Sequence, residues 1–135
     1  MKRRISFILA GLLLATLPAK AEGPEGIWLN EAHTLRMRIS PCGAAYCGSL
    51  VWLQEPRNDD FNPDPAKRSK PLLGTRLLSG MMPSGNADEW KGTAYSFEDG
   101  RSYAESMMLN GDVLLTQGCV KDGAICHSGR WTKVN

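Results

Sequence analysis

The residues of this chain whose types and spacing could support chemistry are, first, its four cysteines. Cys42 and Cys47 are separated by four residues, and Cys119 and Cys126 by six. Paired cysteines bind metals or form disulfides, and structural zinc sites usually space the members of a pair by two to four residues. His127, beside Cys126, is the only further zinc ligand that the pattern offers. An even number of cysteines behind an export signal favours disulfides, so we expect two disulfides and no metal.

The cysteine pairing follows from local turn signals. Asp122-Gly123 lies at the centre of residues 119–126 and is a strong signal for a two-residue hairpin turn. Such a turn places Cys119 opposite Cys126, with Cα atoms about 5.5 Å or less apart, a distance that a disulfide can bridge. Cys42 and Cys47 flank a similar short turn. Of the three possible pairings, we therefore predict the local one, Cys42–Cys47 and Cys119–Cys126.

The densest carboxylate cluster is formed by Asp59, Asp60 and Asp64. Calcium requires six to eight oxygen ligands, and the chain lacks the EF-hand spacing with its closing glutamate. Turn formation and helix capping account for the three aspartates without an ion. The chain also lacks Gly-x-Ser-x-Gly and His-Glu-x-x-His motifs. We interpret His33 and His127 as surface residues, and we expect no catalytic residue and no cofactor.

The first 21 residues have the composition of a cleaved export signal. A basic start at residues 2–4 precedes an apolar run at 5–17, and Ala19-Lys20-Ala21 has the pattern that signal peptidase recognises. The apolar run is too short to span a bilayer of ~30 Å as a helix. We expect residues 1–21 to be removed and residues 22–135 to form one domain, in the periplasm or secreted.

The charge balance excludes one class of partner. The whole chain carries +2, but four of its 16 basic residues lie in the expected signal, which leaves 12 basic against 14 acidic residues, or −2. No basic stripe with interleaved aromatic residues remains, which argues against nucleic acid as a partner. The chain also has no second long apolar run that would anchor it in a membrane.

Beyond the signal the hydrophobic pattern has the period of two that is typical of β-strands. Leu35, Met37 and Ile39, for example, alternate with Arg36 and Arg38. We predict about eight strands, near residues 26–30, 35–39, 48–53, 75–78, 93–97, 102–109, 113–120 and 125–134. Successive hairpin turns indicate an antiparallel up-and-down meander, and its closure into a β-barrel would remove the exposed edges. The predicted fold class is therefore all-β.

One segment interrupts the strand pattern. Residues 55–71 contain four of the eight prolines, which excludes a central strand. Within it, Asp64 is a suitable N-cap and Pro65 a suitable first residue for a short helical turn. We predict a long ordered loop with one helical turn, folded over one end of the barrel.

A series of motifs then resembles a known family. The motifs are GIW at 26–28, PCGAAYCGSLVWL at 41–53, DFNPDPAKR at 60–68, PLLG at 71–74, WKG at 90–92, EDGRSY at 98–103 and RWTKV at 130–134. Together they resemble the bacterial exported family called domain of unknown function 2147. The resemblance implies a lipocalin-like β-barrel without an established biochemical activity. Phe97 stands where a proline is common in the family, and the Cys119–Cys126 pair is not a family hallmark.

The resemblance also implies how one end of the barrel is closed. In lipocalins a tryptophan of a Gly-x-Trp motif in the first strand packs against an arginine of the last strand. Trp28 and Arg130 occupy the matching positions of this chain. A stacked cation–π contact between them would contribute about 0.5–2 kcal/mol. We therefore predict that Trp28 and Arg130 close the barrel.

Three functional hypotheses follow. The first is a binding module for a small apolar or amphipathic molecule, with cavity walls supplied by Trp52, Tyr95, Tyr103 and Met108. The second is a protein-interaction module that works through the loop at 55–74. The third is a hydrolase that uses carboxylates of this loop. We favour binding without catalysis.

Overall fold

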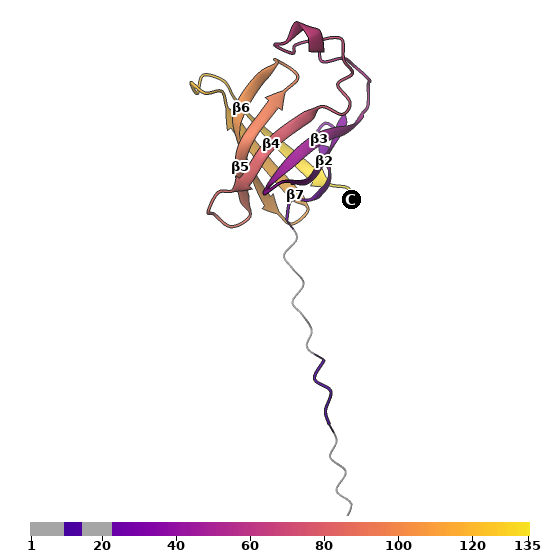
Figure 1. The fold of residues 1–135 in the computed structure, drawn as a ribbon, viewed down its shortest axis with the longest axis vertical. Coiled ribbons are helices and arrows are strands. Elements are labelled where there is room, and N and C mark those ends of the chain that lie inside the picture. The colour runs from indigo at the N-terminus through magenta and orange to yellow at the C-terminus, as the bar shows by residue number, and fades with distance from the viewer. Residues whose placement is uncertain (1–9, 15–22) are drawn as a thin grey trace, which may run out of the picture.

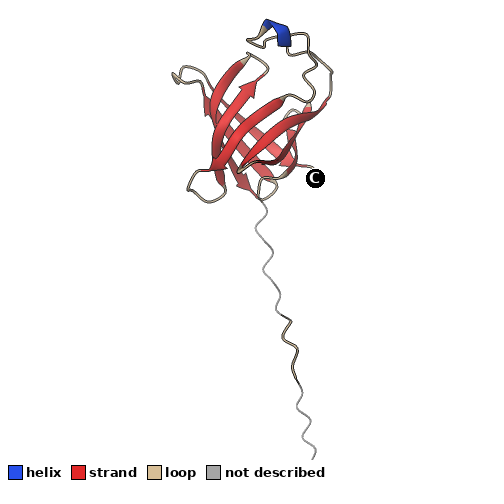
Figure 2. Cartoon of the chain, in the orientation of Figure 1, coloured by secondary structure: helices blue, strands red, loops and turns tan. Residues whose placement is uncertain are grey.

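Eight antiparallel strands of residues 23–135 close into a barrel in this computed structural model, which describes residues 10–14 and 23–135. Each strand pairs with the next along the chain, and the last pairs with the first (Figure 1, Figure 2). The strands are β1 (Gly26–Asn30), β2 (Leu35–Cys42), β3 (Ala45–Leu53), β4 (Arg76–Pro83), β5 (Glu89–Ser96), β6 (Arg101–Asn110), β7 (Val113–Cys119) and β8 (Cys126–Lys133). This confirms the predicted up-and-down barrel. The expected export signal lies outside the described residues, except for 10–14.

The predicted succession of hairpins forms. Asn110 pairs with Val113, so Gly111 and Asp112 make the turn between β6 and β7. In the next hairpin, the amide of Gly123 donates to the carbonyl of Val120, which places the turn at residues 120–123 instead of at a two-residue Asp122-Gly123 loop. Within the described residues, the structure has no helix long and apolar enough to cross a membrane.

The two ends of the barrel carry different connections. One end, which we call the loop end, carries the connections at residues 31–34, 54–75, 97–100 and 120–125. The other end, which we call the plugged end, carries the short connections at 43–44, 84–88 and 111–112. Since all neighbouring strands are antiparallel, consecutive connections alternate between the two ends.

Large apolar side chains fill the barrel toward the plugged end. Trp28, Ile39, Met81, Met107 and Leu114 are fully buried there. Each belongs to the inward-facing set of its strand, because successive side chains of a strand point to opposite faces. This half of the barrel is a packed core.

The loop of residues 54–75 lies over the other end, at the top of Figure 2. Its helical turn is the 3₁₀ helix η1 (Pro65–Lys67), and the carboxylate of Asp64 accepts from the amide of Ala66 as an N-cap. Asp59 is buried and accepts hydrogen bonds from Tyr95 on β5 and from the side chain of Asn62. The predicted loop and helical turn are therefore confirmed, and Asp59 fastens the loop to the barrel.

Candidate functional site

A cavity of about 280 Å³ lies inside the barrel at the loop end. Its apolar walls include Leu35, Leu77, Leu78, Phe97 and Trp131. Its polar wall is formed by inward-facing residues of the last three strands, namely Glu105, Thr116 and His127, with Ser128 beside them. Ligand pockets typically combine mostly apolar walls with a few placed polar groups. The cavity has that composition, and its volume lies just below the usual range of about 300–1,000 Å³ for such sites.

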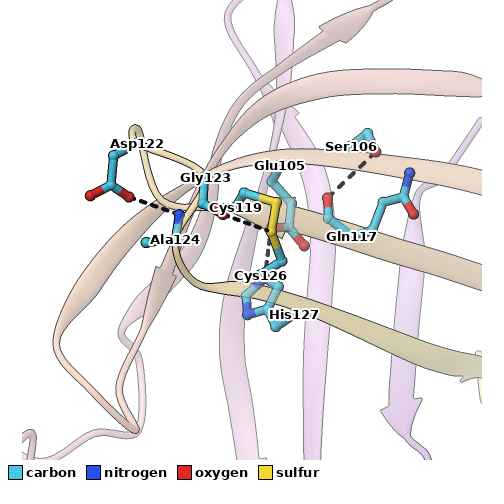
Figure 3. The surroundings of a disulfide bond; sticks show 9 residues. All are labelled: Glu105, Ser106, Gln117, Cys119, Asp122, Gly123, Ala124, Cys126 and His127. Atoms are coloured by element: carbon cyan, nitrogen blue, oxygen red, sulfur yellow. Dashed lines mark hydrogen bonds and ion pairs between the residues drawn. A yellow bond between two sulfur atoms is a disulfide. The ribbon is translucent and has the colours of Figure 1, made fainter.

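The polar wall contains a buried acid paired with a histidine. Glu105 on β6, Gly118 on β7 and His127 on β8 lie in one cross-strand row, because Glu105 pairs with Gly118 and Gly118 with His127. His127 Nε2 lies 2.7 Å from Glu105 Oε2. Figure 3 shows the two side chains beside the Cys119–Cys126 disulfide. The row brings together two polar groups that are 22 residues apart in the chain.

Gly118 makes this contact possible. A Cβ atom at position 118 would overlap the Glu105 carboxylate and the Ala104 carbonyl. Without a side chain between them, Glu105 and His127 reach across β7 and meet above its backbone. A glycine inside a strand often marks such a close approach of other groups.

The histidine ring is held from its other side. His127 stacks on Tyr103 with ring centres 4.2 Å apart and planes 12° from parallel. The hydroxyl of Tyr103 donates to the carboxylate of Asp99, in the turn between β5 and β6. One contact chain therefore runs from Asp99 at the rim through Tyr103 and His127 to Glu105 inside. Its members come from three connected parts of the loop end, which fixes the position of the imidazole.

Burial dominates the electrostatics of Glu105. The residue is only 4% exposed, and removal of water from the carboxylate raises its pKa, an effect that the hydrogen bond with His127 partly opposes. Toward the rim, the bond to Asp99 raises the pKa of Tyr103. Burial alone would raise the pKa of Asp99, but the hydrogen bonds from Tyr103 and from the Arg101 amide lower it overall. Hydrogen bonds thus favour the ionised form of the acid at the rim, whereas burial opposes ionisation of the acid inside.

The structure separates the four residues predicted as cavity walls. Tyr103 is buried against His127, and Tyr95 borders the cavity while its hydroxyl donates to Asp59, 2.6 Å away. Burial is also the main reason why the pKa of Tyr95 is raised, and its bond to Asp59 adds to the shift. The prediction is wrong for Trp52 and Met108, which lie on the outside of the barrel, 38% and 46% exposed.

Strand geometry explains both errors. Met108 follows the inward-facing Met107, so it must point outward. Trp52 would share the inward face of Leu50, but β3 has a bulge here: Leu50 pairs with Met37, and Trp52 with Arg36. The extra residue reverses the alternation. Trp52 therefore lies outside, with the Arg36 guanidinium 5.1 Å from its ring centre.

The predicted partner of Trp28 is also wrong. Trp28 does fill the plugged end, and its indole N–H donates to the carbonyl of Pro24 at 2.9 Å. Arg130, however, is exposed and pairs with Leu115 on the outward face. The residue of β8 opposite Trp28 is Lys133, whose Nζ lies 6.0 Å from the indole ring centre. Lys133 and Arg130 are three positions apart, so they necessarily face opposite sides of the strand.

The two disulfides, together with Asp59 and Asp64, have the expected structures. Cys42 is bonded to Cys47 and Cys119 to Cys126, the predicted local pairing. All four sulfurs are thereby engaged, and none is a free thiolate. Asp59 and Asp64 serve the loop as hydrogen-bond acceptor and helix cap.

The main residues that sequence reasoning missed are Glu105 and His127. His127 was interpreted as a surface residue, and its side chain is 38% exposed, but its contact with Glu105 and its place in the cavity wall were not predicted. A signal was present for Glu105, because it alternates in phase with Tyr103 and Met107, two large residues of a predicted inward face. An acid in such a phase is a candidate for a buried polar site.

Fold and site together define the class: a lipocalin-like barrel, packed at one end and hollow at the other. The chain belongs to a bacterial family described as "Uncharacterized protein conserved in bacteria (DUF2147)", whose sequence model matches residues 26–133. Among solved structures it is similar to the Helicobacter pylori protein HP1028, described as belonging to the lipocalin family. That likeness has a TM-score of 0.70 and 19% sequence identity, and it covers 82% of each chain. Comparison with curated proteins finds no match.

Proposed function

We propose that the protein is a binding module that holds a small amphipathic molecule in the cavity at the loop end. The observation that carries this proposal is the combination, in one cavity, of apolar walls with the buried Glu105 and its partner His127, whose side chain is 38% exposed. The leucines, Phe97 and Trp131 would contact the apolar part of the molecule, and the polar wall would orient its head group.

We propose further that the module is exported. Two disulfides are typical of an oxidising compartment such as the periplasm, and they support the signal-like composition of residues 1–21. The same bonds brace both ends of the barrel, since Cys42–Cys47 lies at the plugged end and Cys119–Cys126 at the loop end.

We propose binding without catalysis at this site. The imidazole of His127 is engaged by Glu105 and stacked on Tyr103. Among the described residues, no serine or cysteine donates a hydrogen bond to His127, as a nucleophile activated by this base would. An oriented Glu–His pair without an adjacent nucleophile is suited to recognition of a polar group.

A cavity-filling substitution tests the proposal. Ala94 on β5 is buried and lines the cavity, so Ala94→Leu places three additional carbon atoms inside it. Ala104→Leu adds the same atoms to an outward-facing, exposed position of the neighbouring strand. Small amphipathic fragments should shift the NMR signals of cavity residues such as Thr116 and Gly129. Ala94→Leu should abolish these shifts, and Ala104→Leu should retain them. Fragments that shift only signals outside the cavity would contradict the proposal.

One observation favours a second candidate function, docking of a protein partner on the loop at 55–74. Phe61 and Leu73 are more than half exposed on this loop, although Asp59 and η1 hold it in a defined shape. Pull-down with Phe61→Ser and Leu73→Ser as controls would test it. A partner retained equally by both variants would exclude the loop as its docking site.

A further inference from the structure

Protein groups satisfy only one oxygen of the Glu105 carboxylate. Its Oε2 accepts from His127, but no described residue donates a hydrogen bond to Oε1. Among the described residues no buried side-chain oxygen lacks a partner, so Oε1 is reached by water although the residue as a whole is only 4% exposed and lines the cavity. A ligand that displaces this water without donating a hydrogen bond leaves the acceptor unsatisfied at a cost in free energy, more so when the carboxylate is ionised. The cavity therefore contains an acceptor that a bound molecule can satisfy.

The charges around the cavity have one sign. Among the described lining residues the acids are Glu98 and Glu105, and no lysine or arginine is present. Asp99 adds a carboxylate at the rim through its bond to Tyr103. The histidine of β8 is the one ionisable base among the lining residues. Arg57 stacks on Phe97, with its guanidinium carbon 5.2 Å from the ring centre, but it does not line the cavity.

We propose that the bound molecule carries a protonated amine with at least one N–H, which donates to the free oxygen of Glu105 while the apolar walls hold its carbon skeleton. The inference rests on the proposed binding function and names the chemistry of its ligand. An ammonium group supplies both the missing donor and the compensating charge, and such charge-assisted bonds are about twice as strong as neutral ones. An anion would instead meet the carboxylates with no cationic side chain of the cavity wall to compensate them.

The position of Glu105 also predicts selectivity within amines. Because His127 occupies one oxygen from the β8 side, the ligand nitrogen must approach Oε1 from the cavity. A quaternary ammonium group brings charge but no N–H, so it leaves the acceptor unsatisfied. Primary amines should therefore bind more tightly than their trimethylated analogues.

The test compares three probes that share a phenyl ring and a short chain: phenethylamine, 2-phenylethanol and phenylacetate. Titration calorimetry of the oxidised protein at neutral pH should show the amine bound at least about tenfold more tightly than the alcohol, as expected for a hydrogen bond to a charged group. Phenylacetate should bind more weakly than both. A fourth probe, the N,N,N-trimethylated analogue of phenethylamine, should bind more weakly than phenethylamine itself.

Glu105→Gln keeps the shape of the side chain and removes its charge. This substitution should lower the affinity for phenethylamine by about tenfold or more and change the affinity for 2-phenylethanol by less than about twofold. Glu98→Gln is the matched control, because Glu98 also lines the cavity but is exposed to solvent, and it should change amine affinity by less than about threefold.

The outcomes separate this inference from the proposed function. Equal affinities for amine and alcohol, both abolished by Ala94→Leu, would retain the binding function and overturn the amine. An amine affinity that is unchanged by Glu105→Gln would overturn it as well. Failure of all three probes to bind the wild-type protein would reject the cavity as a site for molecules of this size, and both proposals with it.

Discussion

The two ends of this barrel are built from the same eight strands, yet one is solid and the other hollow. At the plugged end, Trp28, Met81 and Met107 face inward and fill the interior. At the loop end, the row Glu105–Gly118–His127 replaces large apolar side chains with a polar pair and a glycine. The difference teaches that one closed barrel can combine a packed end with a hollow end, and that the inward-facing residues at each end decide whether it is filled.

The disulfides sharpen this comparison, since each end has one. Cys42–Cys47 braces a short turn beside the packed core, whereas Cys119–Cys126 precedes His127, a wall of the cavity. One disulfide thus lies beside the packed core, and the other lies next to the candidate site.

The largest effect is expected from emptying the plugged end. Trp28→Ala should lower the free energy of unfolding by about 3–5 kcal/mol, because it removes a fully buried indole and leaves a cavity. Urea denaturation measures the loss. Trp52→Ala, on the outside of the barrel, is the matched control and should cost less than about 1 kcal/mol. Similar losses for the two variants would refute the assignment of Trp28 as the plug.

The next effect compares the two disulfides directly. Replacement of either pair by serines should cost about 2–2.5 kcal/mol of unfolding free energy, because the closed loops have similar, short lengths. Only loss of Cys119–Cys126 should also weaken phenethylamine binding, since it loosens the strand start that holds His127. Denaturation and calorimetry on both double variants measure this. Equal effects on binding would remove the distinction between the ends.

Gly118→Ala should disrupt the polar row itself. The new methyl group displaces the Glu105 carboxylate and presses on the Ala104 carbonyl, at a cost on the order of 2 kcal/mol. Glu105→Ala in the same chain relieves the first of these overlaps, so the two substitutions together should cost less than the sum of the single ones. Strict additivity in urea denaturation would show that Glu105 does not lie over Gly118.

A smaller effect is expected where the long loop is attached. Tyr95→Phe removes the hydrogen bond to Asp59 and should cost about 1–2 kcal/mol, since the acceptor is buried. Amide exchange in residues 55–74 should accelerate. Tyr46→Phe is the control, because the Tyr46 hydroxyl has no hydrogen-bond partner among the described residues. Unchanged exchange in Tyr95→Phe would mean that the loop is held by other contacts.

The weakest effect is a pH dependence of stability at the loop end. Burial raises the pKa of Glu105 above its ordinary value of 4.5. Between pH 4.5 and the pKa of the folded protein, folded Glu105 therefore holds a proton that the unfolded chain has lost. Stability from this group is therefore present below pH 4.5 and is lost as the pH rises through the folded pKa. Relative to Glu105→Gln, the wild-type protein should become less stable from acid to neutral pH. The opposite slope in denaturation would indicate that His127 stabilises the ionised form more than burial opposes it.

Much of the fold could be predicted because its signals are local. Period-two alternation located the strands, four prolines located the long loop, and Asp64-Pro65 located its helical turn. Boundaries were less accurate: β4 extends to Pro83 and β5 begins at Glu89, beyond the predicted 75–78 and 93–97. Gly80 and Gly92 obscured the alternation in these strands.

Less of the site could be predicted, because its residues meet only across strands. The bulge between β2 and β3 moved Trp52 outside, and the register of β1 against β8 placed Lys133 instead of Arg130 opposite Trp28. Neither the bulge nor the register can be deduced from the residues of a single strand. The stacking of Tyr103 on His127 joins residues 24 positions apart in the chain, and no local pattern indicates it.

By itself, the sequence determined that the chain forms an antiparallel β-meander with two local disulfides and one ordered loop. These features depend on neighbours along the chain, where turn residues and alternation act directly. Only the tertiary structure decided that the barrel is filled at one end and that Glu105 and His127 meet over Gly118 at the other. The physical reason is that contacts across the lumen depend on strand register and closure, and one extra residue in a strand reverses which side chains point inward.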